Sequence, residues 1–256
     1  MISFFHTTLL GIIEGVTEYI PVSSTGHLLI TQHLLHIPSS DFVSTFEIVI
    51  QSGAICAVAV LYLKTIIKHK DLIWKIAFGF LPTMIAGFVL YPFIKKLFSS
   101  NLSTVSIALI TGGILILIVE KIVSTKSLSN REIHTLTYKE AITLGSLQIF
   151  AFIPGVSRSG ATIIGGLWAG YPRRFLVEFS FLLAVPTILA AGALDMLHSY
   201  KTLTQGNITT LFAGSLVAGI CAYITIKYIL SYISQHDFKV FGWYRIVVGC
   251  ISLLIK

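Results

Sequence analysis

Two acidic residues near the N-terminus are the first residues whose type and spacing could do chemistry. Glu14 and Glu18 lie four residues apart in an otherwise apolar stretch, so that on a helix their side chains share one face. Carboxylate oxygens suit a divalent cation such as Mg²⁺ or Ca²⁺, and one carboxylate can also act as a base. The structural alternative is that one carboxyl is protonated, or that both line a water-filled vestibule. We predict that Glu14 and Glu18 are metal ligands and acid/base groups.

A run of small polar residues follows Pro21. Proline stops one helix, and the hydroxyls can begin another, whose free backbone N–H groups and positive dipole end attract phosphate. The same hydroxyls would serve in simple N-capping, and a lone histidine is often a satisfied core residue. We favour a functional role for this run, which consists of Ser23, Ser24, Thr25, Gly26 and His27. Its hydroxyls and backbone would bind phosphate, and its histidine would transfer a proton.

A single arginine lies in a second polar run later in the chain. Arg158 is the only formally charged residue between Glu140 and Arg173, and its planar fork suits two phosphate oxygens at once. The alternative is that it neutralises Glu14 or Glu18. Its neighbours supply hydroxyl donors and glycines that let backbone approach a ligand: Ser157, Ser159, Gly160 and Thr162. Together with Glu14 and Glu18, the two runs contain the groups that phosphoryl transfer requires.

The elements that carry these residues belong in a bilayer. The chain has 256 residues, of which 55% are apolar and only 11% charged, too few charged residues for a soluble domain of this length. We therefore predict an all-α polytopic membrane protein of one membrane domain, residues 1–256. Six segments are predicted to be spanning helices: 42–63, 74–94, 102–119, 175–197, 208–226 and 240–255.

Two further apolar stretches, 2–30 and 141–171, are interrupted by the polar runs. Each half is about 10 to 15 residues long, which is roughly 15 to 22 Å of helix against a hydrocarbon core of about 30 Å. Neither half can span the membrane alone. We predict two re-entrant helical hairpins whose tips lie at membrane depth, where only protein or a wet cavity can satisfy the backbone.

The two interrupted stretches resemble each other. Residues 11–14 align with 145–148, and 20–26 align with 153–160 if one extra glycine is allowed. We predict a duplication with an inverted topology, the halves being residues 1–125 and 135–256. Eleven basic residues then fall on one side, Lys126 among them, and mainly Lys95, Lys96, Lys201 and Lys256 on the other. The positive-inside rule makes the first side cytoplasmic.

The formal net charge of +7 does not indicate nucleic acid. The basic residues concentrate in short loops between apolar runs, which reports orientation, and no basic stripe is interleaved with aromatic residues. We expect membrane lipid and no nucleic acid as partners.

Over residues 14–27 and 154–162 the chain closely resembles the bacterial undecaprenyl-diphosphatases of the bacitracin-resistance type. The resemblance extends to residues 178–184 and covers the chain. It implies hydrolysis of the polyprenyl diphosphate lipid to undecaprenyl phosphate and inorganic phosphate for peptidoglycan synthesis, with a divalent cation, in the bacterial inner membrane, with the active site facing outward. It implies catalytic roles for these residues: Glu14, Glu18, Ser24, His27 and Arg158. Either Ser24 or His27 could attack phosphorus, and we prefer Ser24; a homodimer is possible.

Two other functions remain open at this stage. Inverted repeats with broken helices are also the architecture of secondary transporters, so that the site could bind an anionic lipid for flipping. The other type of integral-membrane phosphatase carries an Arg-Pro motif that this chain lacks, although residues 24–27 resemble one piece of its signature. A purely structural membrane protein would hardly keep Glu14, Glu18 and Arg158 at membrane depth.

Overall fold

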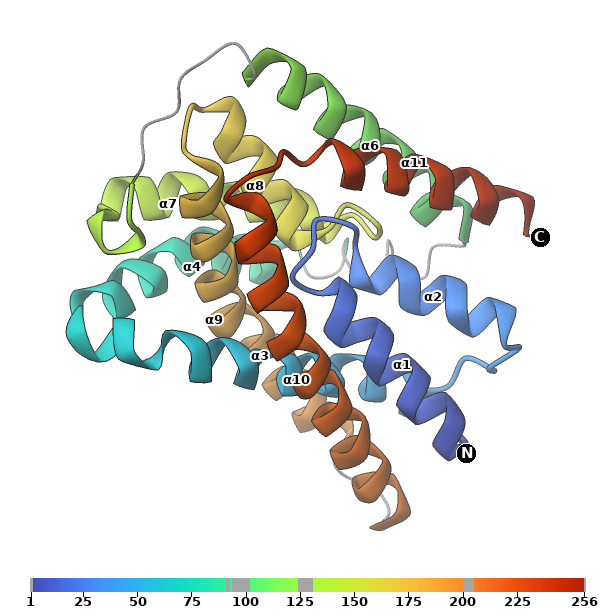
Figure 1. Ribbon diagram of the computed structural model, residues 1–256. Helices are drawn as coiled ribbons and strands as arrows, with labels where there is room; N and C mark the ends of the chain where they lie inside the picture. The colour runs from blue at the N-terminus through green and yellow to red at the C-terminus, as the bar shows by residue number, and fades with distance from the viewer. Residues whose placement is uncertain (1, 91–92, 94–101, 124–130, 200–204, 256) are drawn as a thin grey trace.

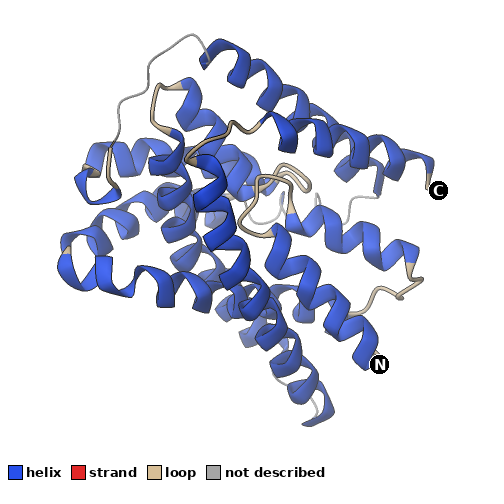
Figure 2. Ribbon diagram, viewed as in Figure 1, coloured by secondary structure: helices blue, strands red, loops and turns tan. Residues whose placement is uncertain are grey.

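The computed structural model describes residues 2–90, 93, 102–123, 131–199 and 205–255, and across these residues it consists of helices and loops without a strand (Figures 1 and 2). This confirms the all-α prediction. The helices are α1 (Phe4–Thr17), α2 (Ser24–Leu34), α3 (Asp41–Lys68), α4 (Asp71–Val89), α6 (Leu102–Val123), η1 (Ile133–Thr135), α7 (Tyr138–Ser146), η2 (Leu147–Phe152), α8 (Arg158–Trp168), α9 (Arg173–Ser199), α10 (Gln205–Ile233) and α11 (Lys239–Leu254).

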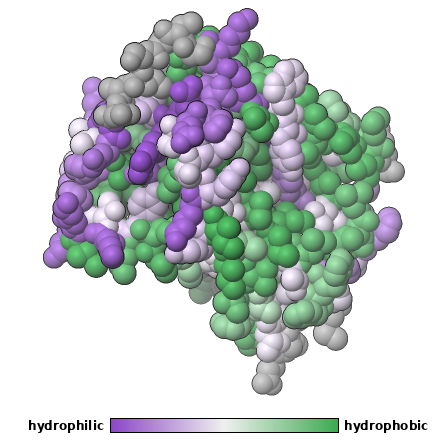
Figure 3. Space-filling view, viewed as in Figure 1, coloured by the Kyte–Doolittle hydropathy of each residue, from purple (hydrophilic) through white to green (hydrophobic). Residues whose placement is uncertain are grey.

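Five of the described helices are long and apolar enough to cross a membrane: α3, α4, α6, α9 and α10. They coincide with five of the six predicted spans, and the sixth, 240–255, corresponds to the 16-residue helix α11. Large apolar side chains are exposed over much of the surface, and in Figure 3 hydrophilic residues gather around α7 and the neighbouring helix ends. The chain is a multi-pass membrane protein. The end of the predicted span 74–94 lies outside the described residues, as do Lys95, Lys96, Lys126, Lys201 and Lys256.

Both predicted interruptions are present. Helix α1 ends at Thr17 and α2 begins at Ser24, while η2 ends at Phe152 and α8 begins at Arg158. Pro21 and Pro154 lie in the two gaps, where proline cannot continue a helix. The two loops meet near the centre of the molecule (Figure 2), where the Ser159 hydroxyl donates to the Ile20 carbonyl over 3.1 Å.

The helix contacts of the first half are matched by those of the second. Helix α1 packs on α10 and α7 packs on α4, while α3 pairs with α9 and α6 with α11. A Cβ on Gly11 would lie 2.8 Å from the Gly214 carbonyl oxygen, and one on Gly145 would lie 1.9 Å from that of Gly79. Both contacts therefore require glycine. Since Gly11 aligns with Gly145 in the sequence, these paired contacts support the predicted duplication.

Buried and interfacial ion pairs hold the helix ends around α7 and α9. Glu120 of α6 is fully buried and accepts from the Arg173 guanidinium and, over 2.9 Å, from the Phe238 backbone N–H. Helix α7 begins with a capping box of Thr137 and Glu140. The Arg131 guanidinium, 2.8 Å from Glu140, lowers the pKa of that carboxyl to about 2.

Candidate active site

The two loops end in the same backbone conformation. Ser23 caps α2 with φ +74° and Ser157 caps α8 with φ +74°, a left-handed value that is uncommon for residues other than glycine. Each serine side chain accepts from a glycine N–H three residues later, Gly26 at 3.4 Å and Gly160 at 3.0 Å. Strain of this kind persists only where the surrounding structure fixes it, and it gathers at functional sites.

This shared geometry places Ser24 and Arg158 at the first residue of their helices. Side chains at that position lie beside the free backbone N–H groups, where an anion is stabilised. The predicted hydroxyl and the predicted guanidinium therefore occupy corresponding places in the two loops.

Glu18 joins these two residues. One of its carboxylate oxygens accepts from the Ser24 hydroxyl, and the other lies 3.0 Å from an Arg158 nitrogen. Arg158 also donates to the backbone carbonyl of Ser180 over 2.6 Å, and its Nε has no hydrogen-bond partner among the described residues. The tips of the two hairpins thus meet through the Glu18 carboxylate, which contacts the Ser24 hydroxyl and the Arg158 guanidinium at the same time.

Glu14 lies behind Glu18 and is fully buried. Its carboxylate is beside that of Glu18, yet neither of its oxygens has a hydrogen-bond partner among the described residues. A buried carboxylate without a donor is costly unless a proton or a cation satisfies it. The pair therefore fits a divalent cation. No cluster of three or more His, Cys, Asp or Glu ligands occurs in the described part of the chain.

A cavity of about 190 Å³ lies between the two loops and α3, α4 and α9. Glu18 and Arg158 line this cavity. Its remaining walls are formed by small, polar and apolar residues: Ser23, Ser24, Thr25, Gln51, Thr83, Gln148, Ala151, Phe152, Pro154, Gly155, Ser157, Thr187, Ile188 and Ala191.

Several predicted phosphate-binding residues lie behind this cavity rather than on its wall. The Thr162 hydroxyl donates to the Arg158 carbonyl over 2.8 Å, and Ser159 is almost fully buried beside Ser157. The N–H groups of Gly26 and Gly160 are taken by the capping serines. These residues shape the loops in this structure.

His27 lies beside the cavity and does not line it. Its Nδ1 is 2.8 Å from the Ser23 carbonyl oxygen, and its Nε2 is 2.8 Å from the Tyr244 hydroxyl. Neither ring nitrogen contacts Ser24, whose proton acceptor in this structure is Glu18.

Arg245 of α11 is a site residue that sequence reasoning missed. It is 1% exposed and donates to the carbonyls of Pro21 and Gly155 over 3.0 and 2.9 Å, one from each loop. It also donates to the carbonyls of Val156, Ala108 and Leu109. A signal was available, because Arg245 is the only charged residue between Lys239 and Lys256, the same isolation that singled out Arg158.

Gln148 aligns with Glu14 in the sequence, which by itself indicates no role for it. It is 1% exposed, lines the cavity, and donates to the Thr187 hydroxyl over 3.0 Å. At this position the second hairpin therefore carries a neutral amide where the first carries an acid.

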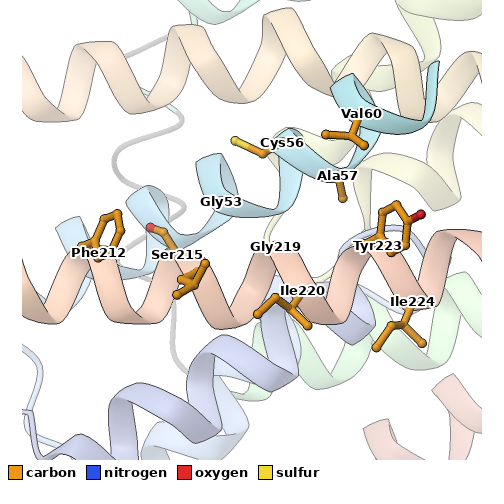
Figure 4. A pocket seen from close by; sticks show the side chains of 11 residues that line it. Gly53, Cys56, Ala57, Val60, Phe212, Ser215, Gly219, Ile220, Tyr223 and Ile224 are labelled. Carbon is orange, nitrogen blue, oxygen red and sulfur yellow. The ribbon is translucent and has the colours of Figure 1, made fainter. Parts of the chain in front are cut away.

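A larger apolar groove of about 620 Å³ lies between α3 and α10 (Figure 4). Gly53 and Ala57 line it, whereas Gln51 lines the polar cavity. Two residues along a helix turn the side chain by roughly 200°, so that the groove and the cavity lie on opposite sides of α3. Among the described residues no charged side chain lines the groove, and it is separate from the site.

Comparison with known proteins shows the family of the chain. The family model described as bacitracin resistance protein BacA matches residues 7–251. The chain belongs to this family. Proteins named undecaprenyl-diphosphatase are similar over nearly the whole length. The one from Wolinella succinogenes is 45% identical over 97% of this chain and 96% of its own, and the one from Bdellovibrio bacteriovorus is 42% identical over 99% and 96%. The Aquifex aeolicus protein is 42% identical over 96% of each.

Proposed function

We propose that this BacA-family chain is an undecaprenyl-diphosphate phosphatase. It hydrolyses undecaprenyl diphosphate to undecaprenyl phosphate and inorganic phosphate, which recycles the carrier lipid for peptidoglycan synthesis and gives bacitracin resistance. The observation that carries the proposal is the contact of Glu18 with both Ser24 and Arg158, in a chain whose named relatives are undecaprenyl-diphosphatases.

In the first chemical step the Ser24 oxygen bonds to the terminal phosphorus. The bond between that phosphorus and the bridging oxygen breaks, and undecaprenyl phosphate leaves. Glu18 takes the Ser24 proton, because its carboxylate already accepts the hydroxyl hydrogen bond. The Arg158 fork binds phosphate oxygens beside the start of α8.

In the second step water regenerates the enzyme. Its oxygen bonds to phosphorus, the Ser24–phosphorus bond breaks, and Glu18 returns its proton to the Ser24 oxygen. Glu14 and Glu18 would hold a divalent cation, Mg²⁺ or Ca²⁺, since the Glu14 oxygens have no other partner among the described residues. Such a cation, when bound, neutralises charge on the phosphates.

The topology belongs to the same proposal. Helix α11 is the sixth spanning helix, and the segments α1–α2 and α7–α8 are re-entrant hairpins entering from opposite faces. The two halves, 1–125 and 135–256, are inverted repeats in the inner membrane. The loops near Arg131, Arg173 and Lys239 are cytoplasmic, and the cavity opens outward.

The test is phosphate release from undecaprenyl diphosphate by detergent-purified protein, with and without chelator. We expect cation-dependent release that Ser24→Ala and Glu18→Gln abolish, and rapid acid quenching should trap phosphate on Ser24. Ser215→Ala, a serine in the apolar groove, should leave the rate unchanged. If folded wild-type protein releases no phosphate with any of several cations, the phosphatase proposal fails and the lipid-carrier alternative replaces it.

A further inference from the structure

Tyr244 of α11 contacts His27, in the first turn of α2, from the far end of the sequence. Its hydroxyl lies 2.8 Å from His27 Nε2, and the two rings stack with centroids 5.5 Å apart and planes 2° from parallel. Helix α11 is itself held on α6 by a 2.6 Å hydrogen bond between Ser106 and Ser252. Tyr244 is 44% exposed, so that it lies at the rim of the molecule and not in the cavity.

The hydrogen-bond network assigns the protons of the His27 ring. A backbone carbonyl can only accept, so that Nδ1, 2.8 Å from the Ser23 oxygen, must carry a hydrogen. In the neutral ring Nε2 is then an acceptor, and the Tyr244 hydroxyl donates to it. Both ring nitrogens are therefore occupied, one by the loop and one by α11.

The carbonyl held by His27 belongs to the strained residue of the loop. Ser23 has φ +74°, and its carbonyl oxygen also accepts from the His27 backbone N–H over 3.2 Å. A non-glycine residue in this conformation needs support from its surroundings. The Ser23 conformation in turn fixes where Ser24 begins α2.

The second loop is supported in another way. Four residues after Ser157 the chain has Ala161 in place of histidine. Arg245 instead donates directly to the carbonyls of Gly155 and Val156. Two adjacent residues of α11 therefore support the loops. Arg245 contacts both loops directly, and Tyr244 contacts the first loop through His27.

We propose that Tyr244 is a positioning residue that holds, through His27, the Ser23 backbone from which the Ser24 nucleophile is presented. The kinetic consequence of this inference rests on the proposed function. The contact between Tyr244 and His27 does not depend on that function. His27 then acts by supporting the loop. The Ser23 carbonyl sets the tautomer of its ring, and Tyr244 fixes the plane of that ring.

The kinetic test is a double-mutant cycle of Tyr244→Phe and His27→Gln. Tyr244→Phe keeps the stacked ring and removes one hydrogen bond, so that kcat should fall about tenfold, while KM changes by less than about twofold. In the His27→Gln background the same change should have no further effect on kcat, because Tyr244 acts only through that ring. Tyr228→Phe, an exposed tyrosine of α10, is the matched control and should leave kcat unchanged.

A second test measures the contact without activity. Diethyl pyrocarbonate modifies unprotonated imidazole nitrogen, and mass spectrometry reports each histidine separately. In the wild-type protein His27 should react at least about tenfold more slowly than the exposed His33 of the same helix, because Tyr244 donates to Nε2. In Tyr244→Phe the His27 rate should rise toward that of His33.

The outcomes separate this inference from the proposed function. Equal reaction of His27 and His33 in wild-type protein would overturn it even if Tyr244→Phe does not fold. An unchanged His27 rate in folded Tyr244→Phe, or the same loss of kcat in both backgrounds, would also overturn it. A wild-type protein that releases no phosphate but shows a protected His27 would refute the function and leave the contact standing.

Discussion

Glu18 contacts both the proposed nucleophile and the proposed phosphate clamp. Its two oxygens contact the Ser24 hydroxyl and the Arg158 guanidinium. Both roles considered for Arg158 from the sequence, carboxylate partner and phosphate ligand, are therefore compatible if the diphosphate replaces Glu18 on the fork. A guanidinium can make this exchange without losing its charge.

Arg158→Lys tests the fork. Lysine keeps the positive charge but cannot bind two phosphate oxygens in one plane, so that kcat/KM for phosphate release should fall about 100-fold. Arg131→Lys is the matched control, since Arg131 pairs with Glu140 away from the cavity, and it should retain the wild-type rate. Near-normal turnover of Arg158→Lys would remove the bidentate clamp from the mechanism.

At the scale of single residues, local spacing in the sequence predicted the site residues of the two polar runs. It did not predict contacts between residues far apart in the chain. Glu18, Ser24 and Arg158 lie in runs whose composition breaks an apolar helix, and the structure brings these three together. Tyr244 and Gln148 could not be assigned in this way, because each lies in an ordinary helical context and acquires its partner only through folding. The metal and catalytic roles stay predictions.

At the scale of elements, α11 contacts both loops as well as packing on α6. The sequence predicted residues 240–255 as a helix, and α11 confirms the helix. The pattern did not indicate that this helix would hold both loop tips, because a hydropathy profile does not report which neighbour a helix packs against. Arg245 gives this helix its role, donating to carbonyls of both loops from a fully buried position.

Arg245→Met should therefore cost stability and activity together. The loop carbonyls of Pro21 and Gly155 would lose their donor inside the protein, and each unsatisfied buried acceptor costs about 1 to 3 kcal/mol. We expect a loss of about 3 kcal/mol or more, seen as a clearly lower Tm in detergent, and loss of phosphate release. Lys64→Met removes an exposed cation of α3 and should change Tm little. A wild-type Tm for Arg245→Met would mean that the two loops keep their conformation without the hydrogen bonds from Arg245.

At the scale of the whole molecule, the paired contacts α1–α10 and α7–α4 relate the two halves of the chain. Sequence alone predicted the repeat from two short alignments, and the matching glycines at Gly11 and Gly145 add packing to that argument. The sequence shows Gln148 in the second half at the position of Glu14 in the first. It does not show that this amide lines the cavity and donates to Thr187, because that contact forms only on folding.

The proposed topology can be tested by cysteine accessibility in intact cells. With Cys56, Cys221 and Cys250 replaced by alanine, single cysteines at Ser39, Lys70 and His236 should report the two faces. We expect a membrane-impermeant maleimide to label Ser39→Cys from outside, and to label Lys70→Cys and His236→Cys only after the cells are opened. Labelling of Lys70→Cys in intact cells would reverse the orientation.

The ion pair between Arg158 and Glu18 also bears on how the cycle ends. Inorganic phosphate bound to the guanidinium must compete with a carboxylate that is covalently part of the same site and always within reach. Each departure of phosphate is then accompanied by re-formation of the 3.0 Å pair, which offsets the attraction that a bare cation would keep for the product. The contact that neutralises Arg158 therefore also favours product release, and strong phosphate binding is compatible with turnover.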